Sequence, residues 1–422
     1  MSEKTYRILC GKLYDGKTDS IQERMEILVC GNRIAEVGKK VAALPGSEVI
    51  DLSDATVTPG LIDAHVHFSY GDWRTRSRDY VYENPSVKGM YLLYNARKAL
   101  RRGFTSVRHM GSNSDDGWGC VAARDLIQKG LFEGARVKVA PHYISTTRGH
   151  GDFSQLISEN PLISDFIWER YPGRVSGPDS CREVVRRQVK FGADFIKIFC
   201  SGGFNSVTDG PEDYAFTDEE LRACIETAHR LNMKITSHTY SNELARKQIE
   251  MRIDGIEHGA LITDPEIFRM MKDRNIEYVP TFTPFEGAMH MDEENLRKQT
   301  PGMEKKLRRY KDMLIESRRL VVSSDLEIGY GTDIVAVHNP YESGWEFFNM
   351  RNSGVGPFRA LAAATRVNAK ILGMDDEIGA LAPGFLADIA AWRRDILTDP
   401  SALLDCCFVM KDGVAYETER DI

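Results

Sequence analysis

Residues 60–68 read GLIDAHVHF, an apolar run of strand length that ends with two histidines, His65 and His67. Side chains at positions i and i+2 of a strand point to the same side, about 6.6 Å apart along it. Both imidazoles can therefore reach one metal ion. Taken alone the pair is only moderately specific, and two hydrogen-bonded core histidines are the alternative interpretation.

This run is the first of a series of strand-length apolar runs that continues along most of the chain. Amphipathic stretches alternate with apolar runs, and one of them opens with Thr217 and Glu220 in the spacing of a helix capping box. Eight alternations of strand and helix predict a (β/α)₈ TIM barrel. The seven further strand-like runs are TSVRHMG, RVKVAPHYIS, DFIKIFCSGG, MKITSHTYS, DGIEHG, EYVPTF and EIGYGTDI.

The two chain ends have a different pattern, in which short strand-like runs alternate with Gly, Asn and Asp turn signals. This pattern is typical of an antiparallel sheet. We expect residues 1–57 and 380–422 to form one small β-sandwich domain beside a barrel of residues 58–379. Residues 286–320 are charged and mostly helical in composition, which fits either an insertion or lid, or a solvated barrel helix.

Polar residues end several of the predicted barrel strands, where the chemistry of such barrels takes place. Histidine and aspartate supply nitrogen and oxygen ligands suited to Zn²⁺ or a similar divalent ion. A buried lysine among them would be repelled by the metal as an ammonium, so it must be neutral or modified. A carbamate formed with CO₂ would make it an anionic oxygen donor able to bridge two metals. Besides His65 and His67, the strand-end residues are Lys197, His238, His258 and Asp333, and His109 and His142 are expected to line the pocket.

The ordered motifs TPGLIDAHVHF, FIKIFCSGG, TSHTY, GIEHG and YGTDI resemble the signature of the amidohydrolase superfamily. That family consists of metal-dependent hydrolases on a (β/α)₈ barrel with a β-sandwich built from both chain ends, and the resemblance extends to the closing LAPGFLADIAAW. It implies two divalent metal ions, with Zn²⁺ expected, and a carboxylated Lys197 that bridges them. In the implied ligand set, the more buried ion takes His65, His67 and Asp333 and the other takes His238 and His258.

A water held between two such ions loses a proton near neutral pH, so a metal-bridging hydroxide can attack an amide carbon. Asp333 is expected to orient this water and to deliver its proton to the leaving amine. Tyr240, two residues after His238, is expected to donate a hydrogen bond to the developing oxyanion, with a packed wall tyrosine as the alternative.

The segments SGGFNSVTDGPED and STTRGHGDF resemble the Xaa-Pro dipeptidase (prolidase)-like and imidazolonepropionase-related branch of the family. This resemblance implies a dipeptide or an N-acyl amino acid as substrate, with His150 as a substrate contact. Related members usually have Gly-Gly-His where this chain has Arg148, Gly149 and His150, and often an arginine where it has His142. We hypothesise that Arg148 binds the substrate carboxylate in a bidentate manner, with a mobile surface arginine as the alternative.

Two other functions remain open. A deaminase or a cyclic-amide hydrolase could use the same scaffold, although deaminating members of the family usually use one metal and lack the bridging lysine. A non-catalytic scaffold protein is the second alternative, but such relatives typically lose ligands and here none is missing.

Composition sets the remaining expectations. The chain has 422 residues, a formal charge of -7 and eight scattered cysteines, and nowhere do eighteen apolar residues run together. The negative net charge argues against a general binder of nucleic acids or of anionic membranes, and the chain lacks an apolar run long enough to span a membrane. The scattered cysteines fit reduced thiols better than disulfides. We therefore expect a cytoplasmic enzyme, without signal peptide, whose partners are a small-molecule substrate and further copies of the chain.

Overall fold

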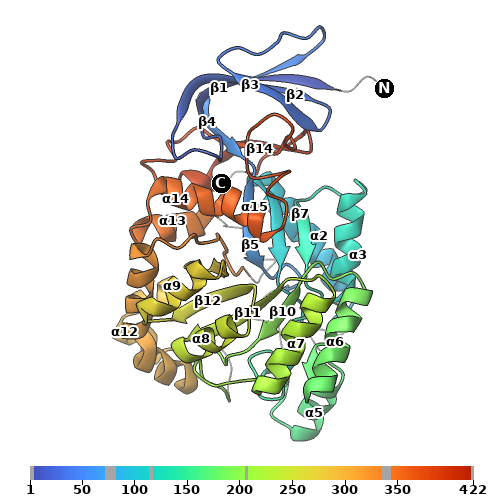
Figure 1. The fold of residues 1–422 in the computed structure, drawn as a ribbon, viewed down its shortest axis with the longest axis vertical. Helices are drawn as coiled ribbons and strands as arrows, with labels where there is room; N and C mark the ends of the chain where they lie inside the picture. The colour runs from blue at the N-terminus through green and yellow to red at the C-terminus, as the bar shows by residue number, and fades with distance from the viewer. Residues whose placement is uncertain (1–3, 72–81, 114–116, 205–207, 335–343, 420–422) are drawn as a thin grey trace.

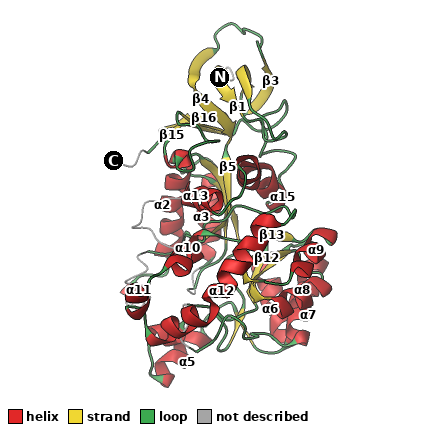
Figure 2. Ribbon diagram, turned by 90° about the vertical axis from the view of Figure 1, so that its left-hand side faces the viewer, coloured by secondary structure: helices red, strands yellow, loops and turns green. Residues whose placement is uncertain are grey.

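The computed structural model divides into a β-sheet region at one end and a larger mixed α/β region (Figures 1 and 2). Both ends of the chain contribute to the sheet region, as predicted. None of the described helices is long and apolar enough to cross a membrane. The residues that the structure describes are 4–71, 82–113, 117–204, 208–334 and 344–419.

The sheet region contains seven strands in the order β16-β15-β14-β4-β1-β2-β3. β1 pairs antiparallel with β2 and parallel with β4, and β4 pairs antiparallel with β14. The pairing runs without a break from β16 to β3, so all seven strands belong to one hydrogen-bonded sheet. The packing of its faces as a sandwich stays a prediction. The apolar side chains of the sheet pack in a core of their own. The strands are β1 (Thr5–Leu13), β2 (Gln22–Cys30), β3 (Arg33–Gly38), β4 (Glu48–Pro59), β14 (Ile389–Trp392), β15 (Cys406–Lys411) and β16 (Val414–Tyr416).

The α/β region contains two parallel sheets, one of three strands and one of four. Their strands are buried on both sides, which explains why they read as continuous apolar runs. A short pair, β8 (Ser145–Thr146) and β9 (Arg174–Val175), lies apart from them. The three-stranded sheet is β5 (Leu61–Val66), β6 (Phe104–His109) and β7 (Arg136–Val139), and the four-stranded sheet is β10 (Ile196–Phe199), β11 (Ile235–Ser241), β12 (Gly255–Leu261) and β13 (Glu277–Val279).

The eighth predicted strand run, residues 327–334, forms no regular strand. Its backbone instead hydrogen-bonds to both sheets. On the β5 side, the Ala64 amide donates to the Tyr330 carbonyl at 2.9 Å, the Asp333 amide to the His65 carbonyl at 2.8 Å and the His67 amide to the Ile334 carbonyl at 2.8 Å. The Gly329 amide donates to the Tyr278 carbonyl at 2.7 Å, and Ile334 forms one bridge with Val66. Asp333 has a φ of 54°, outside the strand region, which interrupts the regular pairing.

Helices lie between the strands along the chain, and Figure 1 shows α6 to α9 on the outer side of the four-stranded sheet. They are α2 (Val87–Arg101), α3 (Trp118–Gln128), α4 (Ser154–Ile157), α5 (Pro161–Glu169), α6 (Pro178–Lys190), α7 (Asp218–Arg230), α8 (Asn242–Glu250), α9 (Pro265–Asp273), α10 (Thr283–His290), α11 (Glu293–Arg297), α12 (Pro301–Ser323), α13 (Gly344–Asn352), α14 (Pro357–Ala362), the π-helix η2 (Ala363–Val367), α15 (Asn368–Ile371) and the 3₁₀ turn η3 (Ala402–Leu404).

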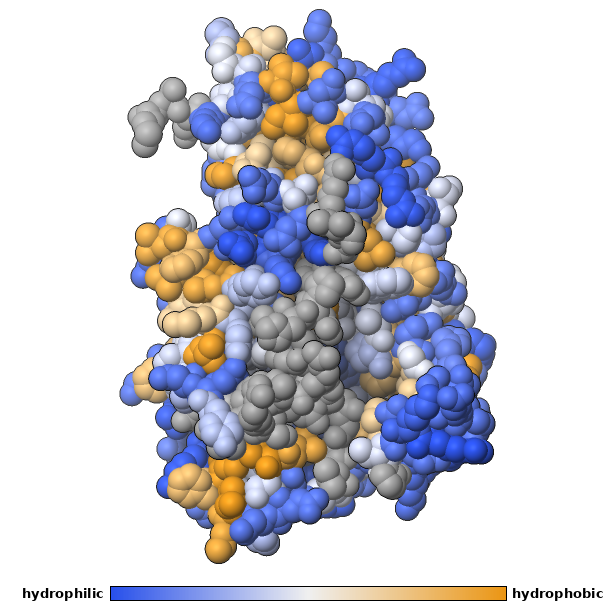
Figure 3. Space-filling view, turned by 180° about the vertical axis from the view of Figure 1, so that it is seen from behind, coloured by the Kyte–Doolittle hydropathy of each residue, from blue (hydrophilic) through white to orange (hydrophobic). Residues whose placement is uncertain are grey.

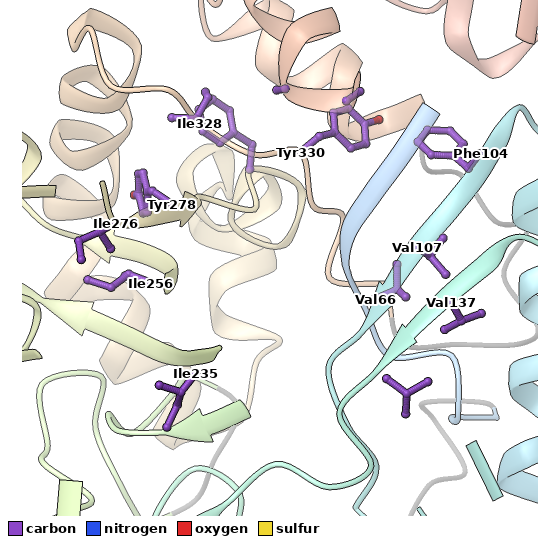
Figure 4. Packing of buried hydrophobic residues seen from close by; sticks show 14 of the residues in the cluster. Val66, Phe104, Val107, Val137, Ile235, Ile256, Ile276, Tyr278, Ile328 and Tyr330 are labelled. Carbon is purple, nitrogen blue, oxygen red and sulfur yellow. The ribbon is translucent and has the colours of Figure 1, made fainter. Parts of the chain in front are cut away.

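The main apolar core joins the two parallel sheets to the helices around them. Figure 4 shows Ile328 and Tyr330 of the eighth run between the side chains of the two sheets. Seen from behind, the surface carries apolar side chains near its lower end, the end at which Figure 1 shows α5 (Figure 3). Helix α5 exposes Leu162, Ile163 and Phe166.

Candidate functional site

The strand-end histidines and Asp333 meet at one cavity of about 120 Å³. His67 follows the end of β5, His238 lies on β11 and His258 on β12. The cavity therefore lies at the carboxyl ends of the parallel strands, where a barrel of this kind has its chemistry. The described residues that line it are His67, His150, Phe199, Phe204, His238, Tyr240, His258, Pro284, Phe285, Ala288, Met303, Leu307 and Asp333.

Three side chains at the strand ends are arranged closely enough to share a metal ion. One ligand atom from each of His65, His258 and Asp333 lies within 4.8 Å of the other two. Asp333 Oδ1 is 3.5 Å from His65 Nε2 and 3.6 Å from His67 Nε2. His238 joins this group through its ring, whose centroid is 4.7 Å from that of His258. The spacing of His65 and His67 thus brings both rings close to the same carboxylate oxygen. That they bind one metal ion stays a prediction.

Hydrogen bonds to Nδ1 orient three of the four histidine rings. His65 Nδ1 is 2.7 Å from Glu257 Oε2, and His67 Nδ1 is 3.1 Å from the Gly111 carbonyl. His258 Nδ1 is 2.7 Å from Thr281 Oγ1. Such bonds set the tautomer of a metal-ligating histidine and turn its Nε2 toward the metal.

Glu257 is a buried carboxylate that the sequence analysis did not identify. Besides His65, it accepts hydrogen bonds from Arg108 and Thr236, each at 2.6 Å. Both Glu257 and Arg108 are almost completely buried. The sequence contained one signal for Glu257, namely its position immediately before His258 in an apolar strand run. A carboxylate in such a run is a buried charge, and a buried charge needs a partner.

Lys197 is the sixth strand-end residue, and it is fully buried on β10. Its Nζ has no hydrogen-bond partner among the described residues, and the same holds for His65 Nε2. Burial lowers the pKa of Lys197 to about 8, although the negative charges of Glu257 and Asp333 oppose this shift. Two buried polar atoms without partners, beside a set of histidine and aspartate donors, fit the metal site that the sequence predicts.

Burial also sets the ionisation of the candidate ligands. It lowers the pKa of His67 to about 4 and lowers those of His65, His238 and His258 well below the usual value. The rings are therefore neutral near pH 7, which is the form that binds metals. Burial raises the pKa of Asp333 to about 7, an effect that the charge of Lys197 opposes.

The backbone is in the left-handed region at three strand ends around the cavity. The φ angles are 69° at His258, 45° at Thr281 and 54° at Asp333. Such conformations cost about 1 to 3 kcal/mol each for residues other than glycine, and they cluster at functional sites. Gly331 is required close by, because a Cβ there would come within 2.7 Å of His65 Cβ.

Tyr240 and His150 lie where the sequence analysis expected substrate contacts. The Tyr240 ring is 4.6 Å from that of His238, and burial raises the pKa of its hydroxyl well above the usual value. His150 stacks on His238 at 4.5 Å and approaches Asp209 at 4.0 Å. Both side chains line the cavity.

His142 and His109 belong to the predicted pocket, but neither is among the residues that line it. His142 packs 4.7 Å from the Trp118 ring, and its Nε2 accepts a hydrogen bond from the Gly117 amide at 3.1 Å. Because β7 ends before His142, the loop that follows turns this ring into the packing around α3. His109 Nδ1 accepts from the Phe68 amide at 3.1 Å, in a buried position beneath His67.

Arg148 is also outside the cavity, so its expected role as a carboxylate anchor has no geometric support. Its side chain is 63% exposed, with NH2 3.1 Å from Asp213 Oδ2 and 2.9 Å from the Thr208 carbonyl. The guanidinium thus binds a neighbouring loop of its own chain.

Residues 286–320 combine both interpretations that the sequence left open. Ala288 of α10 and Met303 and Leu307 of α12 line the cavity. Farther along α12, Ser317 Oγ donates to the Gly259 carbonyl of β12 at 3.1 Å. The first turns of α12 therefore form a wall of the site, while its later turns pack on the sheet.

Comparisons with known proteins agree with this geometry. A model described as the amidohydrolase family matches residues 56–415. Ochratoxinase of Aspergillus niger is 29% identical over 355 residues, which are 81% of this chain and 71% of that protein. Imidazolonepropionase of Hahella chejuensis is 26% identical over 395 residues, which are 84% of this chain and 85% of that protein. The crystal structure of a Xaa-Pro dipeptidase with bound methionine in its active site is similar with a TM-score of 0.87 at 29% identity, covering 98% of this chain and all of that one.

Proposed function

The chain belongs to the amidohydrolase family and is a hydrolase of carbon–nitrogen bonds, and we propose that it cleaves a small amide with the help of two divalent metal ions. The proposed substrate is a dipeptide of the Xaa-Pro kind or an N-acyl amino acid. One observation carries the proposal: Asp333 Oδ1 lies within 3.6 Å of the Nε2 atoms of two histidines, beside a buried lysine.

The residues that would hold the ions are those at the strand ends. We assign His65, His67 and Asp333 to one ion and His238 and His258 to the other. When bound, the ions would ionise a water molecule near neutral pH and polarise the scissile carbonyl. Zn²⁺ is the expected metal, since imidazole and carboxylate ligands suit it.

Lys197 is proposed to carry a carboxyl group. Its pKa of about 8 leaves part of the amine neutral at pH 7, and a neutral amine is the form that reacts with CO₂. The resulting carbamate would be an anion close enough to interact electrostatically with His65 and His238. Its formation would also remove from a buried site an ammonium whose Nζ has no hydrogen-bond partner among the described residues.

Two further side chains are proposed to act on the substrate itself. The pKa of Asp333, about 7, suits a carboxyl group that accepts a proton from water and passes it to the leaving amine. Tyr240 remains protonated because burial raises its pKa, so its hydroxyl can donate to a developing oxyanion. His150, stacked on His238, is placed to contact the substrate beside them.

We further propose that the two parallel sheets and the eighth run close into a (β/α)₈ barrel formed by residues 58–379. Contacts across both gaps support this closure. Ile144 forms a parallel bridge with Ile198 between the sheets, and Ile334 bridges to Val66 on the other side. The Gly329 amide completes the ring by its bond to the carbonyl of Tyr278.

The likeness to known proteins supports the choice of substrate. The Xaa-Pro dipeptidase structure with bound methionine covers 98% of this chain at 29% identity, and ochratoxinase is 29% identical over 81% of it. The buried lysine on β10 favours this reading over a deaminase, which would use a single ion. Two metal ions per chain would support the amide hydrolase, and one would support the deaminase.

Substitution of Lys197 tests the proposal. Lys197→Ala should abolish most hydrolysis in a screen of dipeptides and N-acyl amino acids, and short carboxylic acids should restore part of it by replacing the carbamate. Lys190→Ala, on the exposed end of α6, is the matched control and should retain full activity. Full activity of Lys197→Ala would refute the bridging role.

A further inference from the structure

We propose that α10 and the first turns of α12 form a specificity pocket for one bulky apolar side chain of the substrate. The pocket would select amides of amino acids such as leucine, methionine or phenylalanine over those of small or charged amino acids. This inference rests on the proposed amide hydrolysis and specifies its substrate class.

The cavity has two chemically different sides. The side formed by the strand ends carries His67, His238, His258 and Asp333. The apolar side comes from the end of β10, the loop after it, α10 and α12. Its described members are Phe199, Phe204, Pro284, Phe285, Ala288, Met303 and Leu307.

The apolar side lies directly against the proposed catalytic groups. The Phe285 ring is 6.2 Å from that of His258 and 5.8 Å from that of Tyr240. The Phe204 ring is 5.4 Å from the Tyr240 ring. A substrate whose carbonyl reaches Tyr240 would therefore place the neighbouring side chain against these rings.

The wall belongs to a packed cluster, which gives the pocket a defined shape. Phe204, Tyr240, Phe285 and Leu307 share a core with Leu296, Leu314 and their neighbours. Packed interiors resist changes of volume, so the cavity should discriminate by size. The volume of about 120 Å³ covers the whole cavity, from the strand-end histidines to the apolar wall, so there is room against that wall for one side chain at most.

Charge in the cavity argues against an ionic side chain. Among the described residues that line it there is no lysine or arginine, and its apolar members carry no ionisable side chain. Lys306 lies on α12 between Met303 and Leu307, but its Nζ donates to the Gly203 carbonyl at 2.7 Å and lies 3.8 Å from Asp209. An acidic side chain turned toward the apolar wall, away from the residues that would hold the ions, would thus lose its hydration without gaining a cationic partner there.

Two matched substrate series test the inference. One varies the amine half and the other the acyl half of a simple amide, using Gly, Ala, Leu, Met, Phe, Asp and Lys. In one of the series, kcat/KM for Leu, Met or Phe should exceed that for Gly and Asp by about 100-fold, because a whole apolar side chain is recognised rather than one methylene. Equal or higher values for Gly or Asp in both series would overturn the inference.

Variants of the wall provide a second readout. Ala288→Phe should fill the cavity and lower kcat/KM for Phe substrates relative to Ala substrates by at least about 10-fold. Met303→Ala should enlarge it and shift the preference toward Phe. Leu296→Ala is the matched control, since Leu296 belongs to the same cluster but does not line the cavity, and its substrate preference should equal that of the wild type. An unchanged preference in Ala288→Phe would contradict the pocket.

Calorimetry separates failure of this inference from failure of the proposed function. If no amide is hydrolysed by the metal-loaded protein, the proposed function is wrong. Binding of free phenylalanine, glycine and aspartate then still tests the pocket, with phenylalanine expected to bind most tightly and Ala288→Phe to lose that preference. Equal binding of the three amino acids would reject the pocket on its own.

Discussion

Glu257 links the proposed metal site to the buried charges beneath it. Its carboxylate accepts from Arg108 and Thr236 on one side and lies 2.7 Å from His65 Nδ1 on the other. Partners of this kind keep a ligating imidazole in one tautomer and one orientation. Glu257 should therefore affect metal binding without touching the metal.

Glu257→Gln should weaken metal binding about 10- to 100-fold, because an amide cannot both accept from Arg108 and replace the carboxylate at His65. The measurement is a competition titration against a chromogenic chelator. Glu266→Gln, an exposed residue paired with Arg269, is the control. Unchanged affinity in a Glu257→Gln protein with a normal melting curve would disprove the orienting role.

His150 should make the stability of the metal-free protein depend on pH. Burial lowers its pKa from 6.5 to about 3 in the folded state, so between these values the unfolded chain binds the proton more readily. The stabilisation is present above pH 6.5 and is lost as the pH falls toward 3. In the His150→Asn variant, the free energy of unfolding should depend less steeply on pH in this window. The slope should fall by at most about 1.4 kcal/mol per pH unit. Denaturant titrations from pH 4 to 8 measure it, and an identical slope in the variant would contradict the prediction.

The strand-end residues were predictable because a strand of known direction places its last side chains at a known edge. His65, His67, His258 and Asp333 meet for this reason. Loops give no such direction, which is why the expected roles of His142 and Arg148 find no support in the geometry. Glu257 was missed because the sequence does not reveal which side chains share the interior with His65.

At the scale of elements, the start of α7 shows how a short sequence motif determines local structure. Thr217 Oγ1 accepts from the Glu220 amide at 3.3 Å, and Glu220 Oε2 accepts from the Thr217 amide at 2.9 Å. This is the capping box that the spacing of the two residues predicts, and it is confirmed. Only four adjacent residues are needed for it, so the sequence contains the whole motif.

Thr217→Ala should lower the free energy of unfolding by about 1 kcal/mol, because the Glu220 amide at the helix start loses its side-chain acceptor. Urea denaturation measures this loss. The kcat/KM for the best screened amide should stay unchanged, since α7 does not line the cavity. A loss of activity at full stability would show that α7 has a role in the site.

Longer-range features of elements could not be predicted from local sequence. The helical composition of 286–320 was evident, but whether α12 covers the site or packs on a strand depends on its orientation, and it does both. Likewise the apolar run at 327–334 reads as a strand. Its backbone does hydrogen-bond to neighbours on both sides, but it forms no regular strand, and Asp333 has a φ of 54°.

At the scale of the whole molecule, a buried ion-pair network joins the seven-stranded sheet to the α/β region. Arg136 at the start of β7 donates to Asp388 at 2.7 Å and to Asp412 at 2.6 Å. Asp388 is 2% exposed, and the two carboxylates raise the pKa of the guanidinium. The pairing of the chain ends was predictable from their turn-rich pattern, but the residues at this junction were not. The division at residues 57/58 and 379/380 and the homo-oligomer remain predictions.

Arg136→Met should lower the free energy of unfolding by about 3 to 5 kcal/mol, because it leaves the buried Asp388 without its partner. Arg393→Met removes an exposed pair with Asp54 and should cost at most about 1 kcal/mol. Guanidinium denaturation compares the two variants. Equal costs would mean that the junction contributes no more than a surface ion pair.

The most direct test of the proposed metal-dependent hydrolysis is to count the metal ions per chain in the purified protein while following cleavage of a screened amide. We predict two ions per chain, loss of cleavage when a chelator removes them, and recovery when Zn²⁺ is returned. A correctly folded protein that binds no divalent ion, and whose amide cleavage is the same with or without chelator, would contradict the account.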